Sequence, residues 1–124
     1  RAVDEAVKYT HERKQFGKSI SSFQGVQWML ADMATQVEAS RAMIYSAARM
    51  VDSGAKGIAK VSAMCKLFAS DTAMKVTTDA VQIFGGYGDM RGYLVERLAR
   101  DNRILSIGGG TTEIMKEIIS KWIL

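Results

Sequence analysis

Three glycine-rich stretches are the parts of this 124-residue sequence whose residue types could hold an anion. Arg13 and Lys14 precede Phe16–Gly17, and a guanidinium can fork onto two phosphate oxygens. The other two stretches are residues 84–88 (Phe-Gly-Gly-Tyr-Gly) and 108–112 (Gly-Gly-Gly-Thr-Thr). The stretch at 108–112 could present backbone N–H groups at the start of a helix to an anion. Taken singly, the stretches at 84–88 and 108–112 are more often ordinary helix ends and helix starts.

The side chains that usually carry nucleophilic or metal chemistry are scarce. Cys65 and His11 could form a nucleophile and base, but Cys65 falls on the apolar stripe of an expected helix, which indicates a core residue. His11 lies near an expected helix C-terminus, where a surface cation is favoured. One Cys, one His and no Glu-x-x-His motif exclude a disulfide framework, a Cys-based or His-rich metal centre and a di-iron carboxylate bundle, so we predict no metal site.

The composition favours a soluble helical domain. No proline occurs, whereas about six would be expected at a usage of ~5%. The net charge of +4 is too small to indicate nucleic-acid binding. No apolar run approaches the ~20 residues that a membrane helix needs. We therefore expect neither a nucleic-acid partner nor a membrane span.

Apolar residues recur with the helical period along most of the sequence. We expect the two longest helices near residues 22–51 and 57–84, joined by a short loop and therefore antiparallel. Ser21 or Ser22 could cap the first of these, and Gly17 is the expected stop signal before it. The remaining expected helices span residue 1 to about 14, 93–104, and a terminal segment capped by Thr111 or Thr112. The predicted fold class is all-α: an up-and-down four-helix bundle with an additional short C-terminal helix and no sheet.

The sequence opens on Arg1-Ala2-Val3-Asp4-Glu5, without an initiator Met or a capping residue. We expect the first helix to be already running at Arg1. Residues 1–124 are therefore interpreted as one domain of a longer protein.

In this order and at these separations, the motifs resemble those of the acyl-CoA dehydrogenase family. The ordered set is specific, although no single motif is. The first matching block is Arg-Lys-Gln-Phe-Gly (13–17), followed by Phe-Gln (23–24) and Met-Leu-Ala-Asp-Met (29–33). The others are Asp-Ala-Val-Gln-Ile-Phe-Gly-Gly-Tyr-Gly (79–88), Arg-Asp-Asn-Arg-Ile (100–104) and Gly-Thr-Thr-Glu-Ile (110–114). The resemblance covers the whole chain and is to the family's C-terminal helical domain, so the family's N-terminal helical and middle β domains are absent here.

The resemblance implies FAD as the cofactor, and in the family the bundle of one subunit covers the FAD of its neighbour. Arg13 is implied to contact the pyrophosphate across that interface. Implied contacts on the adenosine half are Lys14, Gln15, Phe23 and Gln24. Further implied contacts from the neighbouring subunit are Gln82, Ile83, Phe84, Gly85 and Gly86. Thr111, Thr112 and Glu113 are implied to approach the FAD of their own subunit, and Gly110 to let the substrate thioester pass.

The position of the catalytic base departs from the common family pattern. Many members carry Tyr-Glu-Gly-Thr in the final block, and that Glu abstracts the substrate's α proton. Gly109 stands at the matching position here, and glycine cannot act as a base. Isovaleryl and long-chain members supply the Glu from an earlier helix, which here would lie upstream of Arg1. We therefore assign no catalytic residue in this chain, and Glu113, in the first turn of a helix, is a weak substitute.

The resemblance implies part of an FAD-dependent acyl-CoA dehydrogenase that oxidises acyl-CoA thioesters to 2,3-enoyl-CoA. This domain would contribute FAD contacts and the interface of a homotetramer, a dimer of dimers, and would be inactive alone. Electrons would pass to an electron-transfer flavoprotein, in the bacterial cytoplasm or the mitochondrial matrix. The alternatives are a related enoyl-CoA reductase or acyl-CoA oxidase, and a catalytically silent flavin-binding or assembly subunit.

Overall fold

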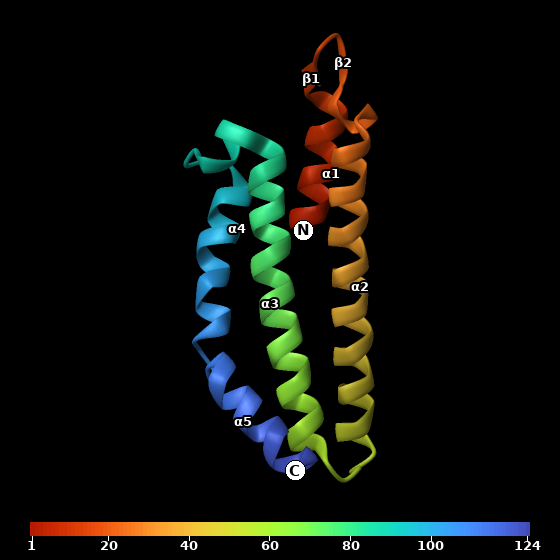
Figure 1. The fold of residues 1–124 in the computed structure, drawn as a ribbon, viewed down its shortest axis with the longest axis vertical. Coiled ribbons are helices and arrows are strands. Elements are labelled where there is room, and N and C mark those ends of the chain that lie inside the picture. Colours follow the sequence, from red (N-terminus) through yellow and green to blue (C-terminus); the bar gives the residue numbers. More distant parts are fainter.

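Two antiparallel helices form the frame of the computed structural model, which describes all 124 residues (Figure 1). They are α2 (Gln24–Asp52, 29 residues) and α3 (Ile58–Phe84, 27 residues). The remaining helices are α1 (Ala2–Glu12), α4 (Leu94–Asn102) and α5 (Thr112–Ile123). The predicted all-α bundle with a short C-terminal helix is confirmed, and the long helices begin and end within two residues of the predicted bounds.

Helix α3 is the central element because it contacts every other helix. The short helix α1 packs beside α2 and α3 at one end of the bundle, while α4 and α5 follow one another down the other side of α3 (Figure 1). The core lies where α1, α2, α3 and α4 meet. Its members are Ala2, Ala6, Met33, Val76, Ala80, Ile83, Phe84 and Val95.

The two long helices are buried to very different degrees. Nine residues of α3 are buried, whereas α2 buries only Met33 and Ser40. Ile44 and Val51, two apolar residues in the second half of α2, are exposed, so the chain itself does not cover that part of the helix. None of the helices combines the length and the apolar character that crossing a membrane requires.

The segment after α1 is a hairpin, not the simple helix stop that we predicted. Helix α1 ends at Glu12, and β1 (Lys14–Gln15) pairs antiparallel with β2 (Lys18–Ser19), so the expectation of no sheet is wrong here. Phe16 and Gly17 form the connection with φ of 52° and 77°. Positive φ at both residues is the type I′ geometry that suits the twist of a tight hairpin. Gly17 therefore shapes the hairpin turn.

One of the predicted helix caps is confirmed and one is wrong. The Thr111 hydroxyl accepts a hydrogen bond from the Ile114 N–H at 3.3 Å and caps α5. Ser21 and Ser22 instead lie in a 3₁₀ turn (Ile20–Ser22), and the residue that precedes α2 is Phe23, which makes no side-chain cap. Two further 3₁₀ turns, Gly85–Asp89 and Arg103–Ser106, follow α3 and α4.

Candidate functional site

The C-terminal end of α3 meets the end of α1 and the hairpin in a cleft of about 580 Å³. We call it the arginine–aromatic cleft. It is lined by Tyr9, Arg13, Gln15, Ile20, Ile83, Phe84, Gly85, Gly86, Tyr87 and Met90. The structure thus brings together six of the residues selected from the sequence, from segments far apart in the chain.

Aromatic side chains build one wall of this cleft. The Tyr9 and Phe84 rings stack with centroids 4.0 Å apart, and Tyr93 meets Phe84 edge-on. The Tyr9 hydroxyl donates to the Phe84 carbonyl at 3.3 Å, which ties α1 to the last turn of α3. Desolvation by burial raises the pKa of Tyr9.

Arg13 carries the positive charge of the cleft. Its backbone N–H donates to the Tyr9 carbonyl at 2.8 Å, and its own carbonyl accepts from the Ile20 N–H at 2.9 Å. Its guanidinium carbon lies 5.6 Å from the centroid of the Tyr87 ring. No ion pair in the structure involves Arg13, so its N–H groups are available to an anionic ligand.

The hairpin presents an unpacked aromatic ring beside the cleft. Phe16 is 91% exposed and has a positive φ, which costs a residue with a Cβ roughly 1–2 kcal/mol. Its ring meets Phe23 edge-on at 6.1 Å, and the Lys18 ammonium lies 4.5 Å above the Phe23 ring. A strained, exposed aromatic residue marks a position that the fold of this chain alone does not explain.

Of the ten residues implied to contact the neighbouring subunit's FAD, four lie outside the cleft lining. Lys14 is exposed on β1, Phe23 and Gln24 stand at the start of α2, and Gln82 is exposed on α3. Conversely, Tyr9 and Tyr87 line the cleft and were not selected. The available signal was the spacing of Tyr9 one helical turn before Arg13 and the place of Tyr87 within the second glycine stretch.

A second hollow, of about 670 Å³, lies where α5 begins against the side of α3. We call it the threonine hollow. It is lined by Asp71, Met74, Lys75, Thr78, Asp79, Arg103, Ser106, Ile107, Thr111, Thr112 and Glu113. Three residues selected from the sequence, Thr111, Thr112 and Glu113, therefore come together here, away from the arginine–aromatic cleft.

The glycine loop before α5 has a backbone that only glycine adopts easily. Gly109 and Gly110 have φ of 67° and 103°. A Cβ on Gly110 would also collide with the methyl group of Met115, whereas the space beside Gly109 is open. The Lys66 ammonium, on α3, donates to the Gly110 carbonyl at 2.5 Å.

The titratable groups near the loop and in the core are poorly suited to act as a base or a nucleophile. Hydrogen bonds from its own backbone N–H and from the Thr111 hydroxyl hold the pKa of Glu113 below its usual range. A general base at neutral pH works best with a pKa near 7, so Glu113 is a poor candidate. Cys65 is buried as expected, and burial raises the pKa of its thiol.

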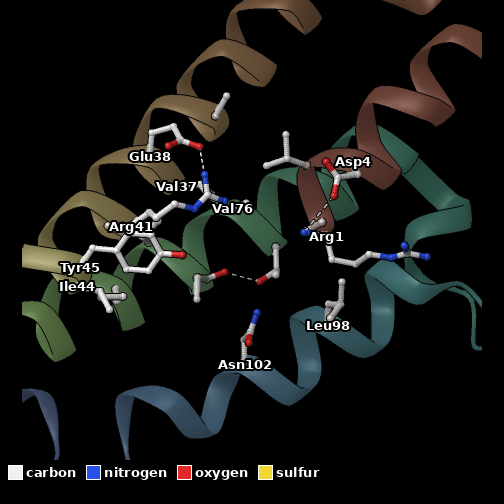
Figure 2. Close-up of a pocket in the computed structure, with 18 residues that line it drawn as sticks. Arg1, Asp4, Val37, Glu38, Arg41, Ile44, Tyr45, Val76, Leu98 and Asn102 are labelled. Atoms are coloured by element: carbon white, nitrogen blue, oxygen red, sulfur yellow. Dashed lines mark hydrogen bonds and ion pairs between the residues drawn. The ribbon is translucent and has the colours of Figure 1, made fainter. Parts of the chain in front are cut away.

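A third groove, of about 550 Å³, lies elsewhere, between the start of α1, the middle of α2 and α3, and α4. Figure 2 shows Val37, Ile44, Tyr45, Val76 and Leu98 around it. The Arg41–Glu38 ion pair lies beside these apolar side chains. None of the residues selected from the sequence lines this groove, and no reactive group points to chemistry there.

Comparison with known proteins shows to which family the chain belongs. The sequence model described as "Acyl-CoA dehydrogenase, C-terminal domain" matches residues 1–124. The chain belongs to the acyl-CoA dehydrogenase family. Its bundle is that of the family's C-terminal domain, and family members are flavoprotein oxidoreductases.

Curated members of the acyl-CoA dehydrogenase family resemble the chain over almost its entire length. It is 53% identical over 123 residues to "Probable acyl-CoA dehydrogenase FadE25" of Mycobacterium tuberculosis. It is 51% identical to acryloyl-CoA reductase (NADH) of Anaerotignum propionicum and 45% identical to the caffeyl-CoA reductase-Etf complex subunit CarC of Acetobacterium woodii. Each match covers 99% of this chain but only 31–32% of the relative.

Solved structures of family members share the fold. Butyryl-CoA dehydrogenase from Megasphaera elsdenii superposes with a TM-score of 0.95 at 43% identity, covering 98% of this chain and 32% of that one. The FAD complex of PigA superposes with a TM-score of 0.94 at 33% identity, covering 99% and 32%. PigA, whose chain includes this fold, therefore binds FAD.

Proposed function

We propose that residues 1–124 are the C-terminal helical domain of an FAD-dependent acyl-CoA dehydrogenase that oxidises acyl-CoA thioesters to 2,3-enoyl-CoA. The observation that carries this proposal is the arginine–aromatic cleft, which gathers Arg13, Gln15 and residues 83–86 from two distant segments. The chain spans about a third of the relatives that it matches, so the active site of the whole enzyme would be completed by other domains.

The residues present fit the chemistry of FAD. The cofactor joins a dianionic pyrophosphate to flat aromatic rings, and when bound it accepts a hydride from the substrate's β carbon. The cleft offers an unpaired guanidinium beside an aromatic wall. The threonine hollow offers the first turn of α5 with two hydroxyl groups, and a helix N-terminus attracts negative charge.

We assign the two regions to two flavins. Arg13 binds the pyrophosphate of a neighbouring subunit's FAD, and the hairpin supplies contacts to its adenosine half. The assigned contacts from the hairpin side are Lys14, Gln15, Phe23 and Gln24, and those from α3 and the turn after it are Gln82, Ile83, Phe84, Gly85 and Gly86. Thr111, Thr112 and Glu113 contact the FAD of their own subunit. The unpacked Phe16 ring supports a contact outside this chain.

Exposed apolar side chains near the ends of α2 and α5 support assembly into a homotetramer built as a dimer of dimers. Val51 on α2 and Trp122 and Ile123 on α5 are more than half exposed. Large apolar side chains gathered on a surface mark interaction sites. The bundle would therefore bury these side chains against sister subunits or against other domains.

The substrate's α proton must be taken by a base from outside this chain. Gly109 has no side chain, and the lowered pKa of Glu113 keeps it a weak base. Open space beside Gly109 leaves room for a carboxylate from another element. We propose that a Glu on a helix upstream of Arg1 supplies it, as in isovaleryl and long-chain members, while Gly110 lets the thioester lie close to the backbone.

Electrons would leave through an electron-transfer flavoprotein. A relative named as a subunit of a reductase-Etf complex supports that partner. The relatives reported above are bacterial, which favours the bacterial cytoplasm over the mitochondrial matrix.

A second candidate is a reductase that adds hydrogen to an enoyl-CoA. The 51% identity to acryloyl-CoA reductase (NADH) favours it. Because the flavin contacts would be the same, flavin binding does not separate the two candidates. Anaerobic incubation of the protein with saturated and with 2,3-unsaturated acyl-CoA separates the two candidates. In a dehydrogenase the saturated thioester reduces the flavin, which loses its colour.

Arg13 variants of the full-length protein test the flavin assignment. A charge-assisted hydrogen bond contributes about 1.5–3 kcal/mol, so Arg13→Ala should weaken FAD binding by about one to two decades. Arg13→Lys should recover only part of this, because an ammonium lacks the planar fork. Arg49→Ala, which removes an exposed Arg from the far end of α2, is the matched control. Wild-type FAD affinity in Arg13→Ala would contradict the assignment.

A further inference from the structure

Lys66 makes an unusual contact for a lysine in a helical bundle. Its half-buried ammonium has no carboxylate partner, and its one hydrogen bond goes to the backbone carbonyl of Gly110, 44 residues along the chain. The bond spans from the side of α3 to the loop before α5. A hydrogen bond from a charged donor to a carbonyl is stronger than one from a neutral donor.

The loop that receives this bond has little else to hold it. Gly109, Gly110 and Thr111 donate no backbone hydrogen bond through their N–H groups. Two consecutive glycines with positive φ have no side chains to pack. Lys66 is therefore the only hydrogen-bond donor that reaches the Gly109–Gly110 segment from another element.

The bond also sets the direction of a neighbouring donor. In a trans peptide the carbonyl and the following N–H point in opposite directions. With the Gly110 carbonyl turned toward Lys66, the Thr111 N–H points away from Lys66, and nothing in the chain accepts a hydrogen bond from it. Thr111 also lines the threonine hollow, so its free N–H belongs to the region assigned to flavin.

The α5 helix dipole does not favour the charge of Lys66. The N-terminus of α5 is the positive end of the helix dipole, and a cation beside it is unfavourable. Lys66 therefore adds positive charge where α5 already carries it. The Glu113 carboxylate in the first turn of α5, with Asp71 and Asp79 in the lining of the hollow, supplies the nearby negative charge.

We propose that Lys66 is a positioning residue that fixes the Gly110–Thr111 peptide, so that the start of α5 presents its donors to the flavin and the substrate thioester. The inference rests on the proposed function of the threonine hollow. Lys66 acts through the loop, and it contacts neither ligand.

Hydrogen exchange measured by mass spectrometry on the full-length protein tests the loop directly. Lys66→Met keeps the unbranched stem and removes the donors. The N–H groups of Gly109, Gly110 and Thr111 make no hydrogen bond and are unprotected in either protein, so the readout is the protected amides that flank them, those of Gly108, Ile114 and Met115. Loss of a charged hydrogen bond should speed the exchange of these amides by about tenfold or more. Core peptides around Val76 and Ala80 should keep their rates, because the bundle remains packed.

Two further variants separate positioning from stability. Lys66→Arg keeps a charged donor and should restore most of the protection. Lys60→Met removes a half-buried lysine of α3 that makes no hydrogen bond and should change nothing. In the same proteins, Lys66→Met should weaken FAD binding by up to about tenfold. The binding free energy of FAD can fall by no more than the free energy that the Lys66 hydrogen bond contributes to holding the loop.

Each outcome decides the inference. Faster loop exchange with weaker FAD binding supports it, and unchanged loop exchange overturns it. Equal acceleration of the core peptides overturns it too, because Lys66 would then serve general stability. If Lys66→Met loosens the loop and FAD affinity stays unchanged while Arg13→Ala loses FAD, positioning fails and the proposed function stands. If both variants keep wild-type FAD affinity, the proposed function fails as well.

Discussion

The arginine–aromatic cleft and the threonine hollow both gather residues selected from the sequence, but they are built by different means. The cleft is made of large side chains: two stacked rings, a guanidinium and a strained hairpin. The hollow is made largely by the backbone: two left-handed glycines, a capped helix start and a lysine bonded to a carbonyl. We propose that the cleft binds its ligand through charge and ring surface, and the hollow through directed N–H and hydroxyl donors.

This difference bears on how each region tolerates change. The cleft shares Ile83 and Phe84 with the core, so its shape depends on the packing of α1 against α3. The hollow lies between the outer side of α3, the loop before α5 and the first turn of α5, and none of its lining residues is buried. Met115 is the buried residue of α5. Substitutions in the cleft should therefore cost more folding free energy than substitutions in the hollow.

The largest expected effect comes from Phe84→Ala. Phe84 is buried, stacks on Tyr9 and meets Tyr93, so its removal should cost about 3–5 kcal/mol of the free energy of unfolding. Phe68→Ala, on the same helix but 38% exposed, should cost much less. Urea unfolding compares the two. Equal losses would show that the stacked pair is not the anchor of the cleft.

Loss of the α5 cap should come next. Thr111→Ala removes the oxygen that accepts the Ile114 N–H and should cost about 1 kcal/mol. Thr111→Ser keeps that acceptor and should stay close to wild type in thermal unfolding. A serine variant as unstable as the alanine variant would argue that the Thr111 methyl group, not the cap, stabilises the hollow.

Gly109→Ala should have a similar or smaller effect on stability and almost none on flavin. No atom crowds the new methyl group, so the cost is that of a left-handed backbone, about 1 kcal/mol. No base is removed, and FAD affinity should stay nearly unchanged. Gly110→Ala meets the Met115 methyl in addition and should be the less stable of the two variants. Strong loss of FAD from Gly109→Ala would contradict the account.

The smallest effect concerns pH. The folded-state pKa of Glu113 is lowered, so its stabilising contribution is complete above the unfolded value, near 4.3, and is lost as the pH falls through the folded value. Wild type should therefore lose stability relative to Glu113→Gln on acidification below about pH 4. Thermal unfolding of both proteins across this range measures the difference. Parallel curves would show that Glu113 makes no such contribution.

The helices were predictable because their apolar residues repeat with the helical period over many turns. A pattern of that length outweighs single residues that depart from it. Gly17 was misread because a glycine after a helix suits both a helix stop and a type I′ hairpin turn, and only the pairing of Lys14 with Ser19 separates them. Tyr9 and Tyr87 were missed because their contacts exist only once α1 meets the end of α3.

The α3 side of the threonine hollow was equally invisible in the sequence. Asp71, Lys75 and Asp79 have the spacing and charge of a solvated helix face, and Lys75 pairs with Asp79 at 2.7 Å. Their place in a hollow depends on where α5 begins. The lowered pKa of Glu113 also needed the cap geometry of Thr111.

The central claim is that the cleft and the hollow of one chain serve the flavins of different subunits. Mixing two defective full-length proteins tests it: Arg13→Ala, defective in the cleft, and the double variant Thr111→Ala/Thr112→Ala, defective in the hollow. If each flavin lies between two chains, half of the sites in a mixed dimer combine an intact cleft with an intact hollow. Random mixing in equal amounts should then restore about a quarter of the wild-type high-affinity sites, measured by FAD titration. No restoration above the two parent proteins would contradict the account, because both regions would then serve the same chain's flavin.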